Sequence, residues 1–359
     1  MASSVRLTRS HSTGFSARPR ARRWLRAGAA LALALGWGAQ SSAAPSRAAQ
    51  SGGTPVSGEL SYTTYNPPAV KRLGFSFDGS SLRITSQHFL ASLTFADGIV
   101  FAPDGKLLVG GGPSGIFEVD PSSGAVQSAH PGGPGAWHVA VDPGGTRAWA
   151  AGLPGPLSEV PLDPFRDGVA HPLTGDDTNV TSVGFAAGKA FYTASDARGI
   201  GAFGTIDLTS FRTTRLMADL RGAHGMTYDA ATGDLLLIGN TDVVQIDPSN
   251  PSVVAASRTF PGLQLDQGTV DGKGHLFAAS STGQLLFVDY SATHHIDDAS
   301  DVVAKAFVDP NLDDFAPLTG PGAKPNHSSG LSLVAVVGAV AAAALIGAGF
   351  AALRSYRNR

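Results

Sequence analysis

The sequence predicts an all-β protein, a β-propeller of six four-stranded blades, followed by one C-terminal transmembrane helix. The main observation is an internal repeat, because five segments align when laid over one another at spacings of 41, 43, 43 and 42 residues. The segments begin near Asp97, His138, Thr181, His224 and Asp266. Each reads as a short apolar strand, a turn rich in Gly or Asp, and a second apolar strand. Four strands per roughly 42 residues is the period of a propeller blade.

Turn residues support the all-β assignment. The chain has 25 Asp and only 3 Glu, and the Asp residues stand in turn contexts such as PDG, DPGG, DGKG and DPSS. A third strand in each unit ends near an Asp, as at Asp120, Asp207, Asp247 and Asp289. Asp side chains accept hydrogen bonds from the backbone of their own turn. We therefore interpret these four residues as turn caps rather than as ligands.

The sixth blade is predicted to combine the two ends of the repeat region. Five units account for residues 97 to 307, and one more inner-strand signal, LDDFAPLTG, begins at Leu312. Before Asp97 lie three strand candidates without an inner strand, GELSYTTYN, VKRLGFSFDG and SLRITSQHFL. Joining them closes the ring, which then has no free sheet edge. Seven blades is the alternative, if one N-terminal strand group belongs elsewhere.

Charge is strongly segregated along the chain. All 28 acidic residues lie between Glu59 and Asp314, and residues 59–330 hold 15 basic residues, a net charge of −13. The first 58 residues contain eight Arg and no acid. An acidic body argues against nucleic-acid binding, which requires neutralisation of phosphates. The absence of Cys excludes disulfides and thiolate metal sites.

The N-terminus is predicted to be a signal peptide, residues 1–43, followed by a linker, residues 44–58. An Arg-rich segment precedes the apolar run AGAALALALGWGA, and the small-residue stretch QSSAAPS follows it. Cleavage after Ala43 fits this pattern. The pair Arg22-Arg23 leaves export by the twin-arginine route open beside the general secretory route.

The C-terminus is predicted to anchor the protein. After the propeller, residues 59–320, and a linker, residues 321–330, come 23 uncharged residues, 331–353, and an Arg-rich tail, residues 354–359. As a helix, the uncharged segment would span about 34 Å, enough for a bilayer core. The basic tail should stay cytoplasmic, which places the propeller outside the cytoplasm in a single-pass protein. A buried core helix is the alternative, and whether the helix is retained or processed stays open.

The repeat alignment also predicts a candidate metal site. Residues that begin the innermost strand of each blade occupy equivalent positions, so their side chains should form a ring at one mouth of the propeller: Asp97, His138, Thr181, His224, Asp266 and Asp314. Carboxylates and neutral imidazoles that converge on one axis can bind a divalent cation such as calcium, magnesium or zinc. The alternative is that a water-filled mouth simply accommodates polar side chains. Asn179 precedes one ring position and is a weaker ligand candidate.

The segments DGIVFAPDGKLLVGG and GIFEVD resemble the NHL, streptogramin-lyase and gluconolactonase/regucalcin class of propellers. The stretch from GHLFAASSTGQLLFVDYSA to LDDFAPLTG is also similar to exported bacterial propellers that end in a PEP-CTERM-type sorting tag. This resemblance covers roughly residues 59–320 and implies the fold more than a function. It implies metal or base positions at His224 and Asp266. The ring has no Glu or Asn, which the enzymes of this class use, and the tail lacks the Pro-Glu-Pro motif of the tag.

Two classes of function follow. The first is a membrane-anchored extracytoplasmic binding or surface-interaction module, with a protein, a glycan or a small molecule as its partner. The second is a metal-dependent hydrolase, lactonase or lyase that works at the ring. Another cluster, His294-His295 with Asp297-Asp298, has metal-binding residue types, but it falls in an outer-strand region where a solvated loop is expected.

Overall fold

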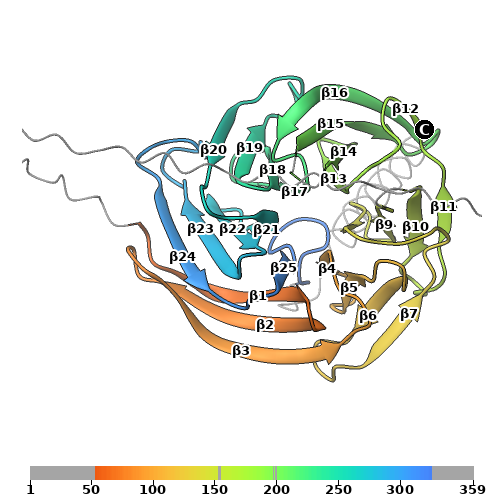
Figure 1. The fold of residues 1–359 in the computed structure, drawn as a ribbon, viewed down its shortest axis with the longest axis horizontal. Helices are drawn as coiled ribbons and strands as arrows, with labels where there is room; N and C mark the ends of the chain where they lie inside the picture. Colours follow the sequence, from red (N-terminus) through yellow and green to blue (C-terminus); the bar gives the residue numbers. More distant parts are fainter. Residues whose placement is uncertain (1–52, 153–154, 197, 199, 326–359) are drawn as a thin grey trace, which may run out of the picture. The chain divides into compact units, whose positions relative to one another are not determined.

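The computed structural model describes residues 53–152, 155–196, 198 and 200–325. The predicted signal peptide, transmembrane helix and basic tail lie outside these residues. Within the described part, the regular structure consists of β-strands arranged in six sheets around a central axis (Figure 1). The prediction of a six-bladed all-β propeller is thus confirmed, and the seven-bladed alternative is wrong. No helix among the described residues has the length and hydrophobicity needed to cross a bilayer.

Five blades are formed by consecutive strands that run from the axis outward. Blade one contains β4 (Ile99–Phe101), β5 (Leu107–Gly110), β6 (Ile116–Val119) and β7 (Val126–Ala129). Blade two contains β8 (Val139–Val141), β9 (Arg147–Ala150), β10 (Leu157–Pro161) and β11 (Val169–His171). Blade three contains β13 (Ser182–Ala186), β14 (Lys189–Ser195), β15 (Ile200–Asp207) and β16 (Arg212–Arg221), with the short β12 (Thr174–Gly175) added parallel to β16. Blade four contains β17 (Gly225–Tyr228), β18 (Leu235–Gly239), β19 (Asp242–Ile246) and β20 (Ala256–Thr259). Blade five contains β21 (Leu265–Val270), β22 (His275–Ser280), β23 (Gln284–Asp289) and β24 (Val302–Phe307).

Blade six closes the ring with strands from both ends of the described chain. Its inner strand is β25 (Leu312–Phe315), and its other strands are β1 (Val56–Tyr65), β2 (Pro68–Phe77) and β3 (Leu82–Ser92). β25 pairs antiparallel with β1, where Tyr62 faces Phe315 and Thr64 faces Leu312. β1 begins at Val56, slightly before the predicted domain start at Glu59. The composite blade is therefore formed as the sequence predicts.

The core consists of six hydrophobic clusters, each packed between two neighbouring blades. Between blades five and six, Phe75 packs on Phe277 with ring centroids 4.8 Å apart, and Phe77 packs on Phe287 at 4.6 Å. A middle strand such as β18 is buried along its whole length because a blade covers each of its faces. This explains the continuous apolar runs of the repeat, since a strand covered on both faces need not alternate polar and apolar residues.

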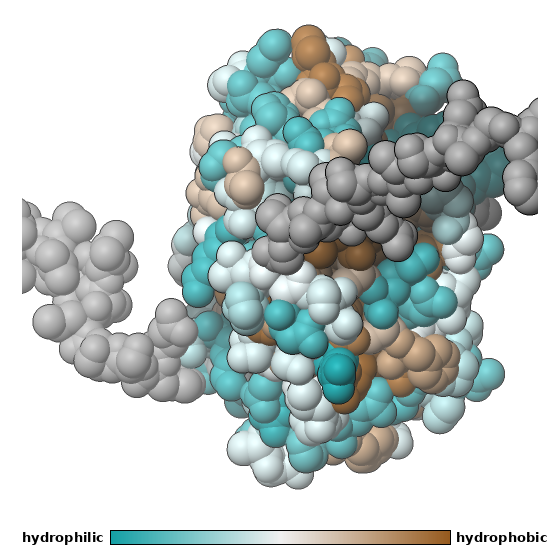
Figure 2. Space-filling model, turned by 90° about the vertical axis from the view of Figure 1, so that its left-hand side faces the viewer, coloured by the Kyte–Doolittle hydropathy of each residue, from teal (hydrophilic) through white to brown (hydrophobic). Residues whose placement is uncertain are grey.

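The two most exposed large apolar side chains of the described residues lie on outer strands. Phe89 on β3 and Phe307 on β24 are 62% and 63% exposed. Viewed from the side where β24 lies, the surface is a mixture of hydrophilic and hydrophobic areas (Figure 2). The outermost strand of a blade has no neighbouring strand beyond it, so this mixed composition is expected.

The four Asp residues that end the third strands cap their turns. Asp120, Asp207, Asp247 and Asp289 each accept a hydrogen bond from the backbone N–H two residues later. Hydrogen bonds from Ser122 and Ser123 lower the pKa of Asp120 to about 2. The prediction that these residues are turn caps is confirmed.

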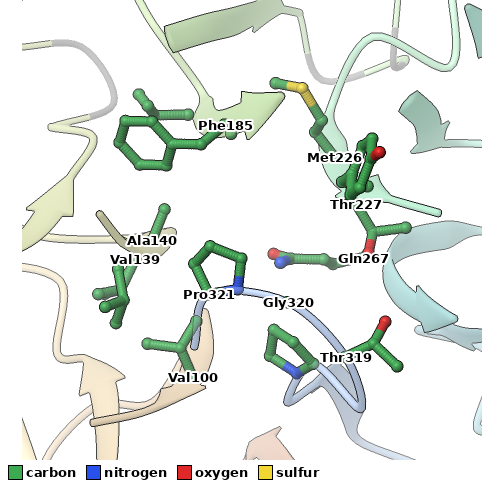
Figure 3. A pocket seen from close by; sticks show the side chains of 15 residues that line it. Val100, Val139, Ala140, Phe185, Met226, Thr227, Gln267, Thr319, Gly320 and Pro321 are labelled. Carbon is green, nitrogen blue, oxygen red and sulfur yellow. The ribbon is translucent and has the colours of Figure 1, made fainter. Parts of the chain in front are cut away.

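The segment after β25 covers the end of the axis at which the inner strands finish. Phe101, the last residue of β4, donates its N–H to the carbonyl of Gly322 at 2.6 Å, and the Thr319 hydroxyl donates to the carbonyl of Val270, the last residue of β21, at 3.2 Å. Thr319, Gly320 and Pro321 lie beside Gln267 at a cavity of about 60 Å³ (Figure 3). The fold thus continues past the predicted boundary at Gly320.

A buried histidine in blade five leads to the first prediction. His275 Nδ1 is 2.6 Å from Asp271 Oδ2, its Nε2 is 3.6 Å from Asp289 Oδ1, and its ring stacks on Phe287. Burial lowers the pKa of His275, but the hydrogen bond and charge of Asp271, helped by Asp289, outweigh burial and raise it. The imidazole therefore holds its proton more tightly in the folded state than in the unfolded state, where its pKa is about 6.5.

We expect the stabilisation by His275 to be fully present below about pH 6.5 and to be lost as pH rises through the folded-state pKa. In denaturant unfolding between pH 5.5 and 9, His275→Gln should be less stable than the wild type by on the order of 1 kcal/mol at low pH, with a smaller difference at high pH. His295→Gln, in an exposed loop, is the matched control. A difference between His275→Gln and the wild type that does not vary with pH would contradict this assignment.

Candidate metal centre

Five of the six residues predicted to form the ring stand at the start of the inner strands, and Asp314 lies further along its strand. Asp97, His138, Thr181 and His224 lie one or two residues before β4, β8, β13 and β17. Asp266 is the second residue of β21, and Asp314 is the third residue of β25. Since the innermost strands surround the axis (Figure 1), five of the six blades place a carboxylate or an imidazole at the same mouth.

His138 is at the centre of the cluster. Its Nε2 atom is 3.3 Å from Asp97 Oδ1, 3.7 Å from Asp314 Oδ2 and 3.8 Å from Asp266 Oδ1. His224 Nε2 is 2.7 Å from Asp266 Oδ1, and the rings of His138 and His224 are 4.8 Å apart, nearly perpendicular. The structure therefore brings together all five side chains that the sequence nominated as ligands.

The donor atoms of the cluster are spaced as the ligands of a bound cation are, in two groups that share His138. The five residues form two overlapping groups, Asp97–His138–Asp314 and His138–His224–Asp266, in which the donor atoms lie within 4.8 Å of one another. Two donors that are each about 2.1 Å from an ion are about 3.0 Å apart at a right angle and about 4.2 Å apart when opposite. The separations of 2.7 to 3.8 Å fall close to this range.

The cluster has a buried side and an accessible side. The side chains of His138 and Asp314 are 3% and 0% exposed, whereas those of His224 and Asp266 are 24% and 26% exposed. Both carboxylate oxygens of Asp314 lack a hydrogen-bond partner within the described part of the chain. A buried carboxylate is costly unless a proton or a cation compensates it. Asp314 is thus the position of the cluster at which a proton or a cation is most needed.

Burial and charge shift the pKa values in the cluster in opposite directions. Burial, and then the charge of Asp266, raise the pKa of Asp97 to about 7. Burial and neighbouring carboxylates raise the pKa of Asp314 well above its usual value. Burial, and then His224, lower the pKa of His138 to about 4. For His224 the lowering by burial is outweighed by Asp266, which raises the pKa. Without a cation, the cluster therefore relies on protons to limit its negative charge.

Two contributors could not be found in the sequence. Asp313 is 7% exposed, and burial together with Asp97 and Asp266 raises its pKa well above its usual value. Ser195, the last residue of β14, places its hydroxyl 2.8 Å from His224 Nδ1. Several of the repeats end their second strand in small residues such as Ser195, so no signal in the sequence distinguishes it.

The two remaining candidates stand apart from the donor set. Thr181, at the third ring position, has no carboxylate or imidazole to offer, and its hydroxyl accepts the N–H of Ser195. Asn179 is exposed and forms a β-bridge with Gly155.

A cavity of about 260 Å³ opens beside the accessible side of the cluster. It is bordered by His224 and Asp266 and by the further residues Asp196, Asn240, Gln264, Leu265 and Ser281. The cavity is mainly polar, and it lies between blades three, four and five. A cation held by the five side chains would be approached from this side.

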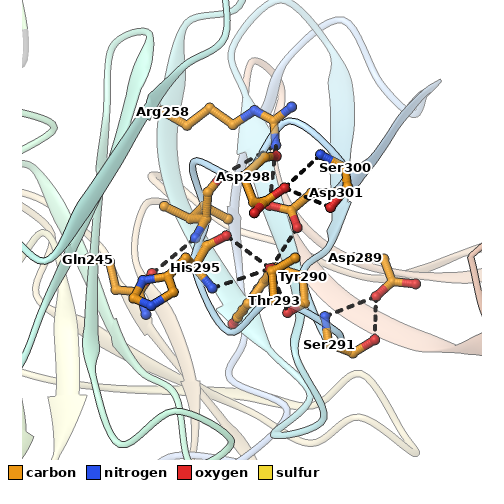
Figure 4. Close-up of polar contacts among 11 residues, drawn as sticks. Gln245, Arg258, Asp289, Tyr290, Ser291, Thr293, His295, Asp298, Ser300 and Asp301 are labelled. Atoms are coloured by element: carbon orange, nitrogen blue, oxygen red, sulfur yellow. Dashed lines mark hydrogen bonds and ion pairs between the residues drawn. The ribbon is translucent and has the colours of Figure 1, made fainter.

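The second histidine cluster is an exposed loop of blade five that packs on blade four. The loop between β23 and β24 is tied to Gln245, whose Nε2 donates to the His294 carbonyl at 2.9 Å, and to Arg258, which donates to the Asp298 carbonyl at 3.2 Å (Figure 4). Asp298 caps the turn at Ser300. His294, His295, Asp297 and Asp298 belong to neither of the potential ligand groups found among the described residues. The interpretation as a loop is confirmed.

Comparison with known proteins identifies no family. No family model matches the chain, and no curated protein matches it. Two solved structures of the extracellular domain of BT4673 from B. thetaiotaomicron are similar, named in one case as part of a one-component system and in the other as part of a hybrid two-component system. They share 13% identity with this chain at TM-scores of 0.42 and 0.44, and cover 64% and 73% of it. The matched region is about a third of each of those chains, 32% and 34%.

Proposed function

We propose that this protein is a membrane-anchored extracytoplasmic propeller that works as a binding module, with a divalent cation held at the mouth of its axis. The observation that supports the proposal best is that Asp97, His138, His224, Asp266 and Asp314 lie together, with the buried Asp314 carboxylate lacking a hydrogen-bond partner among the described residues. An exported location rests on the apolar segments at the two ends of the sequence, which lie outside the described residues.

The donor set favours a transition metal over calcium or magnesium. Calcium and magnesium prefer oxygen ligands, whereas imidazole nitrogens suit metals such as zinc and iron, and the carboxylates also suit manganese. The mixture of two nitrogens and three carboxylates also leaves room for an additional ligand on the accessible side, facing the 260 Å³ cavity. A partner of the module would meet the cation there.

The test is metal analysis of the full chain purified without chelator, combined with thermal unfolding. We expect about one equivalent of bound metal, or a rise in Tm with zinc, manganese or cobalt, because a ligand that binds only the folded state stabilises it by about 2.7 kcal/mol at 100 times its Kd. Asp97→Asn combined with Asp266→Asn should abolish the response and leave the blades folded. Asp297→Asn, in the exposed loop of blade five, should leave it intact.

Two results would count against the cation site. One is a wild-type chain that carries no metal and whose Tm responds to none of zinc, manganese, cobalt, calcium or magnesium. The other is a double variant that responds like the wild type. If a primary amine such as methylammonium raised the Tm instead, the unpaired carboxylates would be a site for an organic cation, since an ammonium group offers three hydrogen-bond donors.

The cavity beside the cluster favours a second candidate function, a metal-dependent hydrolase, lactonase or lyase. A cation with an accessible position can polarise a carbonyl group or activate a bound water molecule. The metal-loaded chain would then hydrolyse lactones or esters, and the double variant would not. Equal rates for both proteins across a panel of lactones and esters would leave the binding module as the function.

A further inference from the structure

We propose that Ser195 is a positioning residue, whose hydroxyl holds the His224 imidazole in the tautomer and orientation that present Nε2 to the cation. The inference rests on the proposed cation site and assigns a role to blade three. That blade has Thr181 at its ring position and supplies no ligand atom to either donor group. Blade three therefore contributes to the site by holding His224, which belongs to blade four.

Blade three contacts His224 at two points. Ser195 Oγ lies 2.8 Å from His224 Nδ1, and the hydroxyl of Thr193 donates to the backbone carbonyl of His224. Both residues belong to β14, two positions apart, so their side chains extend from the same face of the strand. The imidazole and its backbone are thus held from one strand of the neighbouring blade.

Thr181 fixes the position of Ser195. Its hydroxyl accepts the backbone N–H of Ser195 at 2.8 Å and lies 3.4 Å from Ser195 Oγ. Thr181 is fully buried, and its own N–H donates to the carbonyl of Thr193 at 2.7 Å. Thr181, Ser195 and His224 thus form a chain of hydrogen-bonding groups. The support that Thr181 gives to this chain explains why a threonine stands at the third ring position.

The chemistry of a neutral imidazole makes this hydroxyl important. A histidine that binds a cation through Nε2 must carry its proton on Nδ1, and that N–H needs an acceptor. Ser195 Oγ is placed to accept it, while the Ser195 proton can point toward Thr181 Oγ1. Without a cation, the Asp266 carboxylate 2.7 Å from Nε2 favours a proton there, and Ser195 then donates to Nδ1. A hydroxyl can serve both arrangements because it is donor and acceptor, whereas an alanine side chain serves neither.

The test uses cobalt(II) as a probe of the full chain, since its visible absorption reports the ligand geometry. Loss of a residue that orients a metal-binding histidine typically lowers metal affinity 10- to 100-fold. We expect Ser195→Ala to lower cobalt affinity by that factor and to alter the absorption spectrum, and Ser195→Thr to restore both. Ser281→Ala is the matched control, because Ser281 borders the same cavity and its hydroxyl bonds Gln264 rather than a ring residue. The control should bind cobalt as the wild type does.

A second measurement keeps the inference testable should Ser195→Ala fail to fold. In the zinc-loaded wild type labelled with ¹⁵N-histidine, the imidazole signal that is lost in His224→Gln should show a protonated Nδ1. The inference would be overturned if His224 Nδ1 carried no proton, whether that nitrogen binds zinc itself or is free of metal. It would also be overturned by a Ser195→Ala chain with wild-type affinity and spectrum. In both of those cases the cation site would stand. A wild type that binds neither cobalt nor zinc would instead overturn the cation site and the role of Ser195 together.

Discussion

A chain that ends at Pro310 is expected to lose the cooperative unfolding transition of the propeller. The truncation removes β25, the inner strand of blade six, including the fully buried Leu312 and Phe315. Burial of one such side chain contributes about 1.5–3 kcal/mol, and a whole domain is stable by only about 5–15 kcal/mol. The inner edge of β1 would also lose its partner, and the covering segment with its bonds to Phe101 and Val270 would be lost.

The matched control ends at Lys324 and keeps β25 together with the segment that covers the axis. Melting followed by circular dichroism, together with limited proteolysis, compares the two chains. The control should melt cooperatively and resist protease. The chain that ends at Pro310 should melt broadly or lack a transition, and be cleaved quickly. Equal midpoints and equal protease resistance would mean that blade six is complete without β25, contrary to the pairing with β1.

Asp314→Asn is expected to have opposite effects on stability and on cation binding. Asp314 is fully buried and neither carboxylate oxygen has a partner among the described residues, so a neutral amide should relieve a penalty of about 1–3 kcal/mol in the cation-free protein. The same change removes a charged ligand from the buried side of the site. We expect the cation-free Tm to rise and zinc or cobalt affinity to fall at least about 100-fold, which corresponds to roughly 2.7 kcal/mol.

Asp313→Asn is the matched control for that experiment. Asp313 is the adjacent residue, is also buried, and has a raised pKa, but it belongs to neither potential ligand group. It should also stabilise the cation-free protein while keeping most of the cation affinity. Calorimetric titration with zinc and thermal unfolding in chelator measure the two effects separately. If Asp313→Asn and Asp314→Asn reduce affinity equally, repulsion in the whole cluster rather than ligation by Asp314 determines binding.

The blades, the closure of the ring and the ring positions could all be predicted from the repeat pattern. These properties are local, because strand length, turn chemistry and residue order recur every 41 to 43 residues and can be aligned without knowing the fold. The turn-capping Asp residues contact backbone only two positions away, so their role is also predictable. Once a strand occurs at the inner position of each blade, its first residues must meet at one mouth, which is why five ligand candidates were found together.

How these residues differ from one another depends on contacts between blades, which the repeat pattern does not contain. Equivalent positions in the alignment become a buried pair, His138 and Asp314, and a more accessible pair, His224 and Asp266, a difference that the repeat pattern does not contain. Ser195 is 29 residues from His224 in the chain and contacts it only because β14 and β17 lie in neighbouring blades. The distances, burial and hydrogen bonds on which cation binding depends arise between blades, where no periodic pattern in the sequence records them.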